Sequence, residues 1–162
     1  MLKTDRLTLS KITEQDKEVY AKLYLDSELN KFWGYDYTQD LGDNAPTPDY
    51  FYSFMQGLKD SKQEFSFAVR LNGAMIGEVV LHNFGYYANV EMGFRFFSEF
   101  QGNGYALESA TAVKEFVFNT LGAKKLQCKC YKQNLSSVRL IQKLGLTKCG
   151  EDHKYFFFET NN

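Results

Sequence analysis

The fold is decided by the stretch Glu91-Met-Gly-Phe-Arg-Phe-Phe-Ser-Glu-Phe-Gln-Gly-Asn-Gly-Tyr-Ala106. Its first half is typical of a β-strand, and its middle is a short loop. Gln101-Gly102-Asn103-Gly104 then opens an amphipathic helix, whose apolar residues recur near one face. These residues are Ala106, Leu107, Ala110, Val113, Phe116, Val117 and Leu121.

A strand, a glycine loop and a helix start together form an arrangement that can hold a phosphate. The first N–H groups of a helix have no internal partner, and the peptide dipoles add partial positive charge there. Glycines let an anion approach the backbone, so a pyrophosphate can bind without a lysine. The loop matches neither a Walker loop nor the dinucleotide pattern G-x-G-x-x-G. A plain glycine-rich turn is the alternative interpretation.

The bulk composition is that of an ordinary globular protein. The chain has 162 residues, of which 44% are hydrophobic and 24% charged, and we expect a single domain over residues 1–162. The net charge of −1 favours no nucleic-acid partner. We expect no membrane association, because no apolar run approaches the length of a transmembrane helix and the first residues lack a signal-peptide core.

The three cysteines suggest reduced thiols rather than a metal site. Cys128 and Cys130 are spaced C-x-C, Cys149 stands apart, and no histidine cluster lies at zinc spacing. We therefore expect no metal and a cytoplasmic location.

Periodicity and turn residues predict the remaining elements, with Asn72-Gly73 as the strongest hairpin signal. The expected strands are Arg6–Ile12, Glu64–Leu71, Ala74–His82, Asn89–Phe97, Lys125–Tyr131, Thr147–Glu151 and Lys154–Glu159, with a turn at Asn83–Ala88. The expected helices are Glu14–Leu25, about Thr47–Lys59, the helix after Gly104, and one that Asn134 caps and Gly145 ends. The order β-α-α-β-β-β-α-β-α-β-β predicts an α+β fold with about four helices and a mostly antiparallel mixed sheet of six to seven strands.

Several motifs at matching positions resemble the GNAT acetyltransferase superfamily. Gln101, Gly104 and Ala106 fit its Gln/Arg-x-x-Gly-x-Gly/Ala loop, and Asn134-x-x-Ser137 leading to Lys143-Leu-Gly-Leu146 is similar to its late helix, with Leu146 in place of the usual Phe. The opening Leu2-Lys-Thr-Asp-Arg-Leu-Thr-Leu9 and the strand Glu91-x-Gly-Phe94 resemble the RimJ/RimL-like branch, which includes ribosomal-protein N-acetyltransferases. The resemblance covers nearly the whole chain and implies a GNAT-like fold.

The resemblance also implies the chemistry, which is direct transfer of an acetyl group from acetyl-CoA to an amine. By position, the pyrophosphate would bind at Gln101, Gly102, Asn103, Gly104, Tyr105 and Ala106. The strand backbone at Phe94, Arg95 and Phe96 would pair with the pantetheine arm, and Asn134 and Ser137 would lie beside it. Helix capping alone is an alternative role for Asn134, and simple exposure is one for Ser137.

The acid and the base are less determined by the sequence. Many relatives carry a tyrosine where this chain has Ile141, so Ser137 or a water is the candidate proton donor. Glu91 is the preferred base, with Glu78 and His82 as alternatives.

The acceptor site is expected at Trp33, Tyr35 and Asp36 of an aromatic loop, with His82 nearby. The acceptor would be a small amine such as a polyamine, or a protein N-terminus. The oligomeric state stays open between monomer and homodimer. Two hypotheses compete with this one. The protein could bind acyl-CoA as a non-catalytic or sensor protein on the same fold, or it could bind another protein through the Trp33 loop.

Overall fold

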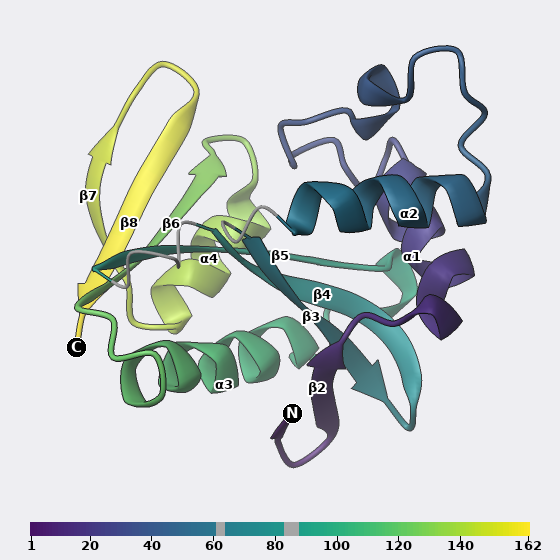
Figure 1. Cartoon of the computed structure of the whole chain (residues 1–162). Helices are drawn as coiled ribbons and strands as arrows, with labels where there is room; N and C mark the ends of the chain where they lie inside the picture. The colour runs from purple at the N-terminus through teal and green to yellow at the C-terminus, as the bar shows by residue number, and fades with distance from the viewer. Residues whose placement is uncertain (61–63, 83–87) are drawn as a thin grey trace.

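The strands form one mixed sheet between two layers of helices. The computed structural model describes residues 1–60, 64–82 and 88–162, and in these ranges eight strands pair in the order β1-β2-β3-β4-β5-β6-β8-β7 (Figure 1). The strands are β1 Leu2–Lys3, β2 Leu7–Lys11, β3 Glu64–Leu71, β4 Ala74–His82, β5 Asn89–Phe96, β6 Lys125–Tyr131, β7 Thr147–Glu151 and β8 Tyr155–Asn161. The α-helices are α1 Lys17–Leu25, α2 Pro48–Lys59, α3 Tyr105–Asn119 and α4 Leu135–Lys143.

The predicted α+β class, the four helices and the mostly antiparallel sheet are confirmed. The sheet has one or two strands more than expected, because Leu2–Lys3 pairs back on Thr8 and Leu9 as a short edge strand. The helix expected from Glu14 begins as a 3-10 turn at Glu14–Asp16. The turn predicted at 83–88 lies, except for Ala88, outside the described residues.

The two faces of the sheet carry separate apolar clusters, because neighbouring residues of a strand point to opposite faces. One cluster joins α3 and α4 to the sheet through residues such as Val113, Ile141 and Met92. The other lies under α1 and α2 and includes Tyr24 and Phe51. None of the helices within the described ranges is long and apolar enough to cross a membrane.

The parallel pair β5 and β6 stays together over only part of its length. β5 pairs with β6 at Asn89, Val90 and Glu91, whereas it pairs with β4 as far as Phe96. Over the same region β6 pairs with β8 along its whole length, from Lys125 to Tyr131. The two strands therefore part beyond Glu91, and the β6-facing edge of β5 is left for another extended chain to bind.

Candidate active site

A cavity of about 570 Å³ opens where β5 and β6 part. Residues of β5, β6 and α4 line it, and the segment before α2 supplies aromatic side chains. Its lining contains Phe32, Trp33, Gly34, Tyr35, Tyr37, Leu58, Glu64, His82, Glu91, Met92, Gly93, Phe94, Lys129, Cys130, Tyr131, Asn134, Ser137, Ile141 and Tyr155.

The aromatic loop lies directly on the β5 backbone. A Cβ atom at Gly93 would lie 3.1 Å from the Trp33 ring, so the absence of a side chain there permits the contact. The indole N–H of Trp33 donates to the Tyr37 hydroxyl at 2.6 Å. Gly34 approaches the hydroxyls of Tyr131 and Tyr155 in the same way, at 3.2 and 3.3 Å from its ideal Cβ position. The loop therefore spans the gap from β5 to β6 and β8.

A buried ion pair supports this loop from below. Arg95 places Nε 2.8 Å and Nη2 2.7 Å from Oε1 of Glu78, whose side chain is fully buried. The guanidinium also stacks on Tyr24 and Trp33, 3.6 and 4.0 Å from the ring centroids. The Arg95 side chain thus faces α1, and its expected contact with a cofactor rests on its backbone. Glu78 was an alternative candidate for the catalytic base. Its carboxylate forms the ion pair with Arg95, and it does not line the cavity.

Four ionisable side chains form a row across the end of the sheet. Strand register pairs Glu64 with His82 and His82 with Glu91. His82 Nδ1 lies 3.5 Å from Glu64 Oε2, and Lys129 Nζ lies 3.3 Å from Glu91 Oε1. Burial favours a higher pKa for Glu64, but the hydrogen bond from His82 and nearby positive charges outweigh it, so its pKa lies below the ordinary value. The row thus places two carboxylates, an imidazole and an ammonium group side by side at the edge of the cavity.

The start of α4 brings two predicted residues into the cavity. The Asn134 side chain caps the helix, because its Oδ1 accepts from the Ser137 N–H at 3.2 Å. Asn134 therefore both caps α4 and lines the cavity. Ser137 is hydrogen-bonded to Cys130, a contact that partly offsets the rise in the pKa of that thiol caused by burial. Ile141 lies close by and is only 1% exposed.

The glycine loop stands at the far end of β5 and is open to solvent. Gly102 and Gly104 have φ angles of 78° and 82°, which glycine adopts without strain. The Gln101 side chain donates to the Phe96 carbonyl at 2.9 Å and so ties the loop to the strand. The first hydrogen bond within α3 runs from Glu108 N–H to the Gly104 carbonyl, so the N–H groups before it remain available to an anion.

Arg6 fixes this loop, a role that sequence reasoning missed. Its Nη1 donates to the Asn103 carbonyl at 3.1 Å, its Nε donates to Glu108 at 2.7 Å, and the guanidinium lies 4.5 Å above the Tyr105 ring. The opening motif contained Arg6, but its partners lie about a hundred positions away in the sequence. We infer that Arg6 positions the loop, with its side chain 47% exposed beside it.

The structure brings together some of the predicted residues. The cavity lining includes Trp33, Tyr35, His82, Glu91, Phe94, Asn134 and Ser137 and lacks Asp36, Arg95, Phe96 and residues 101–106. Asp36 instead caps the 3-10 helix Tyr37–Leu41, with Oδ1 accepting from Thr38 N–H at 3.0 Å. Tyr131 and Tyr155 were not predicted, although the alternation of β6 places Tyr131 on the same face as Lys129.

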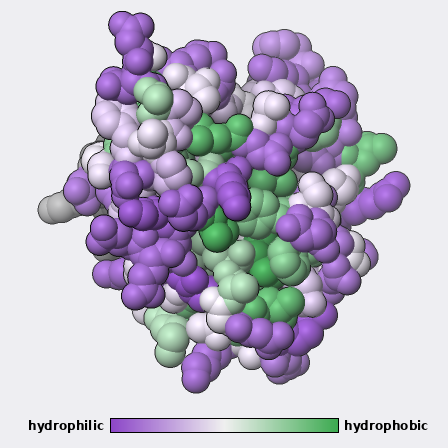
Figure 2. Space-filling model, turned by 90° about the vertical axis from the view of Figure 1, so that its right-hand side faces the viewer, coloured by the Kyte–Doolittle hydropathy of each residue, from purple (hydrophilic) through white to green (hydrophobic). Residues whose placement is uncertain are grey.

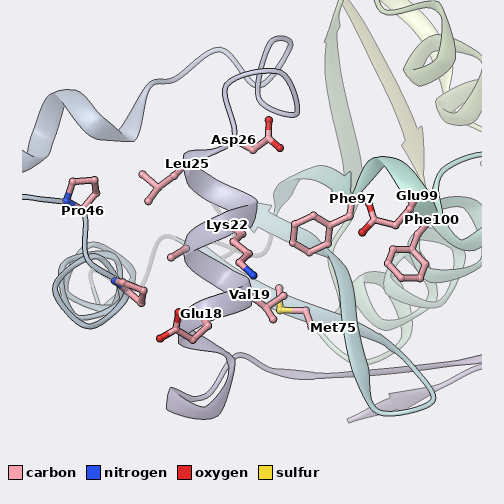
Figure 3. A pocket seen from close by; sticks show the side chains of 12 residues that line it. Glu18, Val19, Lys22, Leu25, Asp26, Pro46, Met75, Phe97, Glu99 and Phe100 are labelled. Atoms are coloured by element: carbon pink, nitrogen blue, oxygen red, sulfur yellow. The ribbon is translucent and has the colours of Figure 1, made fainter.

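A second, larger cavity of about 740 Å³ lies beside α1 (Figure 3). Apolar side chains such as Val19, Met75 and Phe97 line it, and Glu18, Asp26 and Glu99 lie at its edge. Figure 2 shows apolar surface on the right-hand side of the molecule of Figure 1, within a hydrophilic rim. This cavity contains none of the predicted site residues. No group of three or more His, Cys, Asp or Glu suited to a metal occurs among the described residues.

Comparisons with known proteins agree with this geometry. Residues 6–147 match the family model described as an acetyltransferase (GNAT) domain. An uncharacterized N-acetyltransferase, YoaA of Bacillus subtilis, is 25% identical over 158 residues, which cover 97% of this chain and 88% of the relative. The spermidine N-acetyltransferase of Vibrio cholerae, solved with CoA and spermine, superposes with a TM-score of 0.81 at 18% identity, covering 98% of this chain and 96% of that one.

A second solved structure has the same fold. RimL, a ribosomal L7/L12 alpha-N-protein acetyltransferase in complex with CoA, superposes with a TM-score of 0.79 at 15% identity, covering 98% of this chain and 95% of that one. At these identities the structures show the common fold, and the family model shows the membership. From its matching domain, its sheet order and the parting of β5 and β6, the chain belongs to the GNAT acetyltransferase family.

Proposed function

We propose that this protein transfers an acetyl group from acetyl-CoA directly to a primary amine, with both substrates bound at once. The observation that carries the proposal is the parting of β5 from β6 between an exposed glycine loop and a cavity lined by aromatic and ionisable side chains. The free edge of β5 suits the amide groups of a pantetheine arm, and the N–H groups before Glu108 suit a pyrophosphate.

The cavity side chains have distinct roles in this reaction. The free β5 edge can hold the thioester and offer an N–H to its carbonyl oxygen, where negative charge develops. Ser137 lies among the cavity residues and can donate a hydrogen bond or a proton to the departing thiolate. Holding both substrates side by side supplies much of the rate, and no covalent enzyme intermediate is needed.

The acceptor is a primary amine of a polyamine, another small molecule or a protein N-terminus. Glu64 and Glu91 at the cavity edge attract a cation, and the aromatic rings of Trp33 and Tyr35 can pack on it. A spermidine acetyltransferase and a ribosomal-protein acetyltransferase are both among the structural neighbours. The cytoplasmic location, the lack of nucleic-acid, membrane and metal partners, and the choice between monomer and homodimer stay predictions.

One observation favours a second candidate, a protein that binds acyl-CoA without catalysing transfer. Ile141 is buried at the cavity where many relatives carry a tyrosine, and it has no proton to donate. Binding of acetyl-CoA with no thiol release over a broad amine panel would favour this candidate.

The replacement Ser137→Ala is expected to lower kcat by about 100-fold, the lower end of the range for a proton-transfer group, with little change in acetyl-CoA affinity. The assay follows thiol release with spermidine and with short peptides as acceptors. Ser136→Ala is the matched control, because Ser136 is the exposed neighbour on the same helix turn. Equal activity in both variants would remove Ser137 from the chemistry, and no turnover in the wild-type protein would favour the non-catalytic candidate.

A further inference from the structure

Among the residues that the structure describes, His82 lies in the middle of the ionic row and has an ion-pair partner on one side only. Its Nδ1 approaches Glu64 of β3, while Glu91 of β5 is its register partner on the other side. Both carboxylates are partly exposed, at 25% and 28% of the side chain, as is His82 at 33%. The imidazole therefore reaches the cavity with Nδ1 next to Glu64, and no side chain of the described residues binds Nε2.

We propose that His82 is the proton acceptor for the amine substrate and that Glu64 is its positioning residue. Since a carboxylate only accepts hydrogen bonds, Nδ1 carries the proton in neutral His82, and Nε2 has a free lone pair. This inference rests on the proposed acetyl transfer and extends it to the group that removes the proton. Glu64 acts through the ring and fixes both its orientation and its tautomer.

Proton balance is simple in this scheme. The bound ammonium gives one proton to Nε2 of His82, directly or through a water, and becomes a neutral amine. The amine nitrogen then forms a bond to the thioester carbonyl carbon and the carbon–sulfur bond breaks. The Ser137 hydroxyl gives its proton to the thiolate and takes the second proton from the nitrogen, so that the serine is restored. The products are the acetylated amine, free CoA thiol and protonated His82, which releases its proton to solvent.

Glu91 is less suited to this role than His82. Lys129 Nζ lies 3.3 Å from Glu91 Oε1, so that carboxylate already has an ion-pair partner. An ordinary glutamate has a pKa of about 4.3 and a histidine one of about 6.5, so an imidazole takes a proton near neutral pH more readily. Glu91 contributes negative charge that attracts the ammonium.

A direct test measures the tautomer of His82 by ¹⁵N NMR, without any acceptor. The chain has two histidines, and the exposed His153 in the turn between β7 and β8 is an internal reference. The proposal predicts the Nδ1–H tautomer in neutral His82, and a loss of that preference in Glu64→Gln. An Nε2–H tautomer in the wild-type protein would overturn it, whatever the variants do.

A second test uses pH-rate profiles, with His153→Gln as the control. Among the described residues, the charged and titratable groups that share the cavity with His82 are Glu64 of β3, Glu91 of β5, Lys129 and Tyr131 of β6, Tyr155 of β8, and Tyr35 and Tyr37 before α2. Lys59 of α2 and Arg95 of β5 act on Glu64. Glu64→Gln removes the negative charge beside the ring, and a nearby carboxylate in general favours the charged form of an imidazole. The acid limb of kcat/KM should therefore move about 1 unit toward lower pH in Glu64→Gln.

With spermidine or a peptide as acceptor, His82→Gln should lower kcat/KM about 100-fold or more and remove that limb. An acid limb that is unchanged in both variants would contradict the proposal. Calorimetric titration with acetyl-CoA accompanies each variant and the wild-type protein. Failure of acetyl-CoA to bind the wild-type protein would count against the proposed function, whereas intact binding with the wrong tautomer would count against His82 alone.

Discussion

Replacing Glu78 with glutamine is expected to destabilise the protein by about 3–5 kcal/mol, because it leaves the Arg95 charge buried without a counterion. Arginine cannot lose its proton to escape this cost. The Arg95 side chain is 4% exposed and the Glu78 side chain 0%. The Arg95 guanidinium also stacks on the Trp33 ring. The measurement is the free energy of unfolding from urea titration.

The double variant Glu78→Leu/Arg95→Met removes both charges of the ion pair, whereas Glu78→Gln leaves the Arg95 charge without its partner. Since apolar residues of similar volume often replace a buried ion pair at little cost, this variant should be more stable than Glu78→Gln alone. Glu151→Gln is the control, because Glu151 pairs with Lys132 and Lys148 at the exposed surface and its replacement should have a much smaller effect. Equal effects of Glu78→Gln and Glu151→Gln would show that Arg95 has another counterion.

Replacing Gly104 with valine is expected to weaken CoA binding by about 10- to 100-fold. Gly104 has a φ of 82° directly before α3, and a β-branched residue is strained in that region. The loop must then rotate, and its N–H groups no longer converge on one anion. Losing one charge-assisted hydrogen bond of about 1.5–3 kcal/mol accounts for a change of this size.

Calorimetric titration with CoA measures this effect. Gly57→Ala is the matched glycine control, because Gly57 lies in α2, has open space around its Cβ position and has no positive φ. That variant should bind CoA as the wild-type protein does and gain some stability, since alanine favours a helix. Unchanged CoA affinity in Gly104→Val would place the phosphate elsewhere.

The fold could be predicted from the sequence because turns, helix caps and strand alternation depend on residues that are neighbours in the chain. The Asn72-Gly73 turn, the cap at Asn134 and the alternation of Lys125–Tyr131 each depend on neighbouring residues, and the structure confirms all three. The short strand Leu2–Lys3 was missed because two residues carry no period, and it exists only through its pairing with β2.

The candidate site was predictable only in part, because it depends on contacts across the sheet. The motif positions pointed to Asn134, Ser137 and Glu91, which do line one cavity. The partners that give the side chains their roles lie far away in sequence, as Glu78 does from Arg95. Asp36 had the right charge and the right loop, yet its carboxylate is used to cap the turn that follows.

The most direct test of the central claim is a ¹H–¹⁵N NMR titration of the protein with CoA, with NADH as the comparison. CoA is expected to shift the amide signals of residues 102–106 and of β5 at residues 93–95, whereas NADH is expected to leave them in place. Signals that move instead around the cavity beside α1, or that do not move at all, would contradict the assignment of the CoA site to the glycine loop and the free edge of β5.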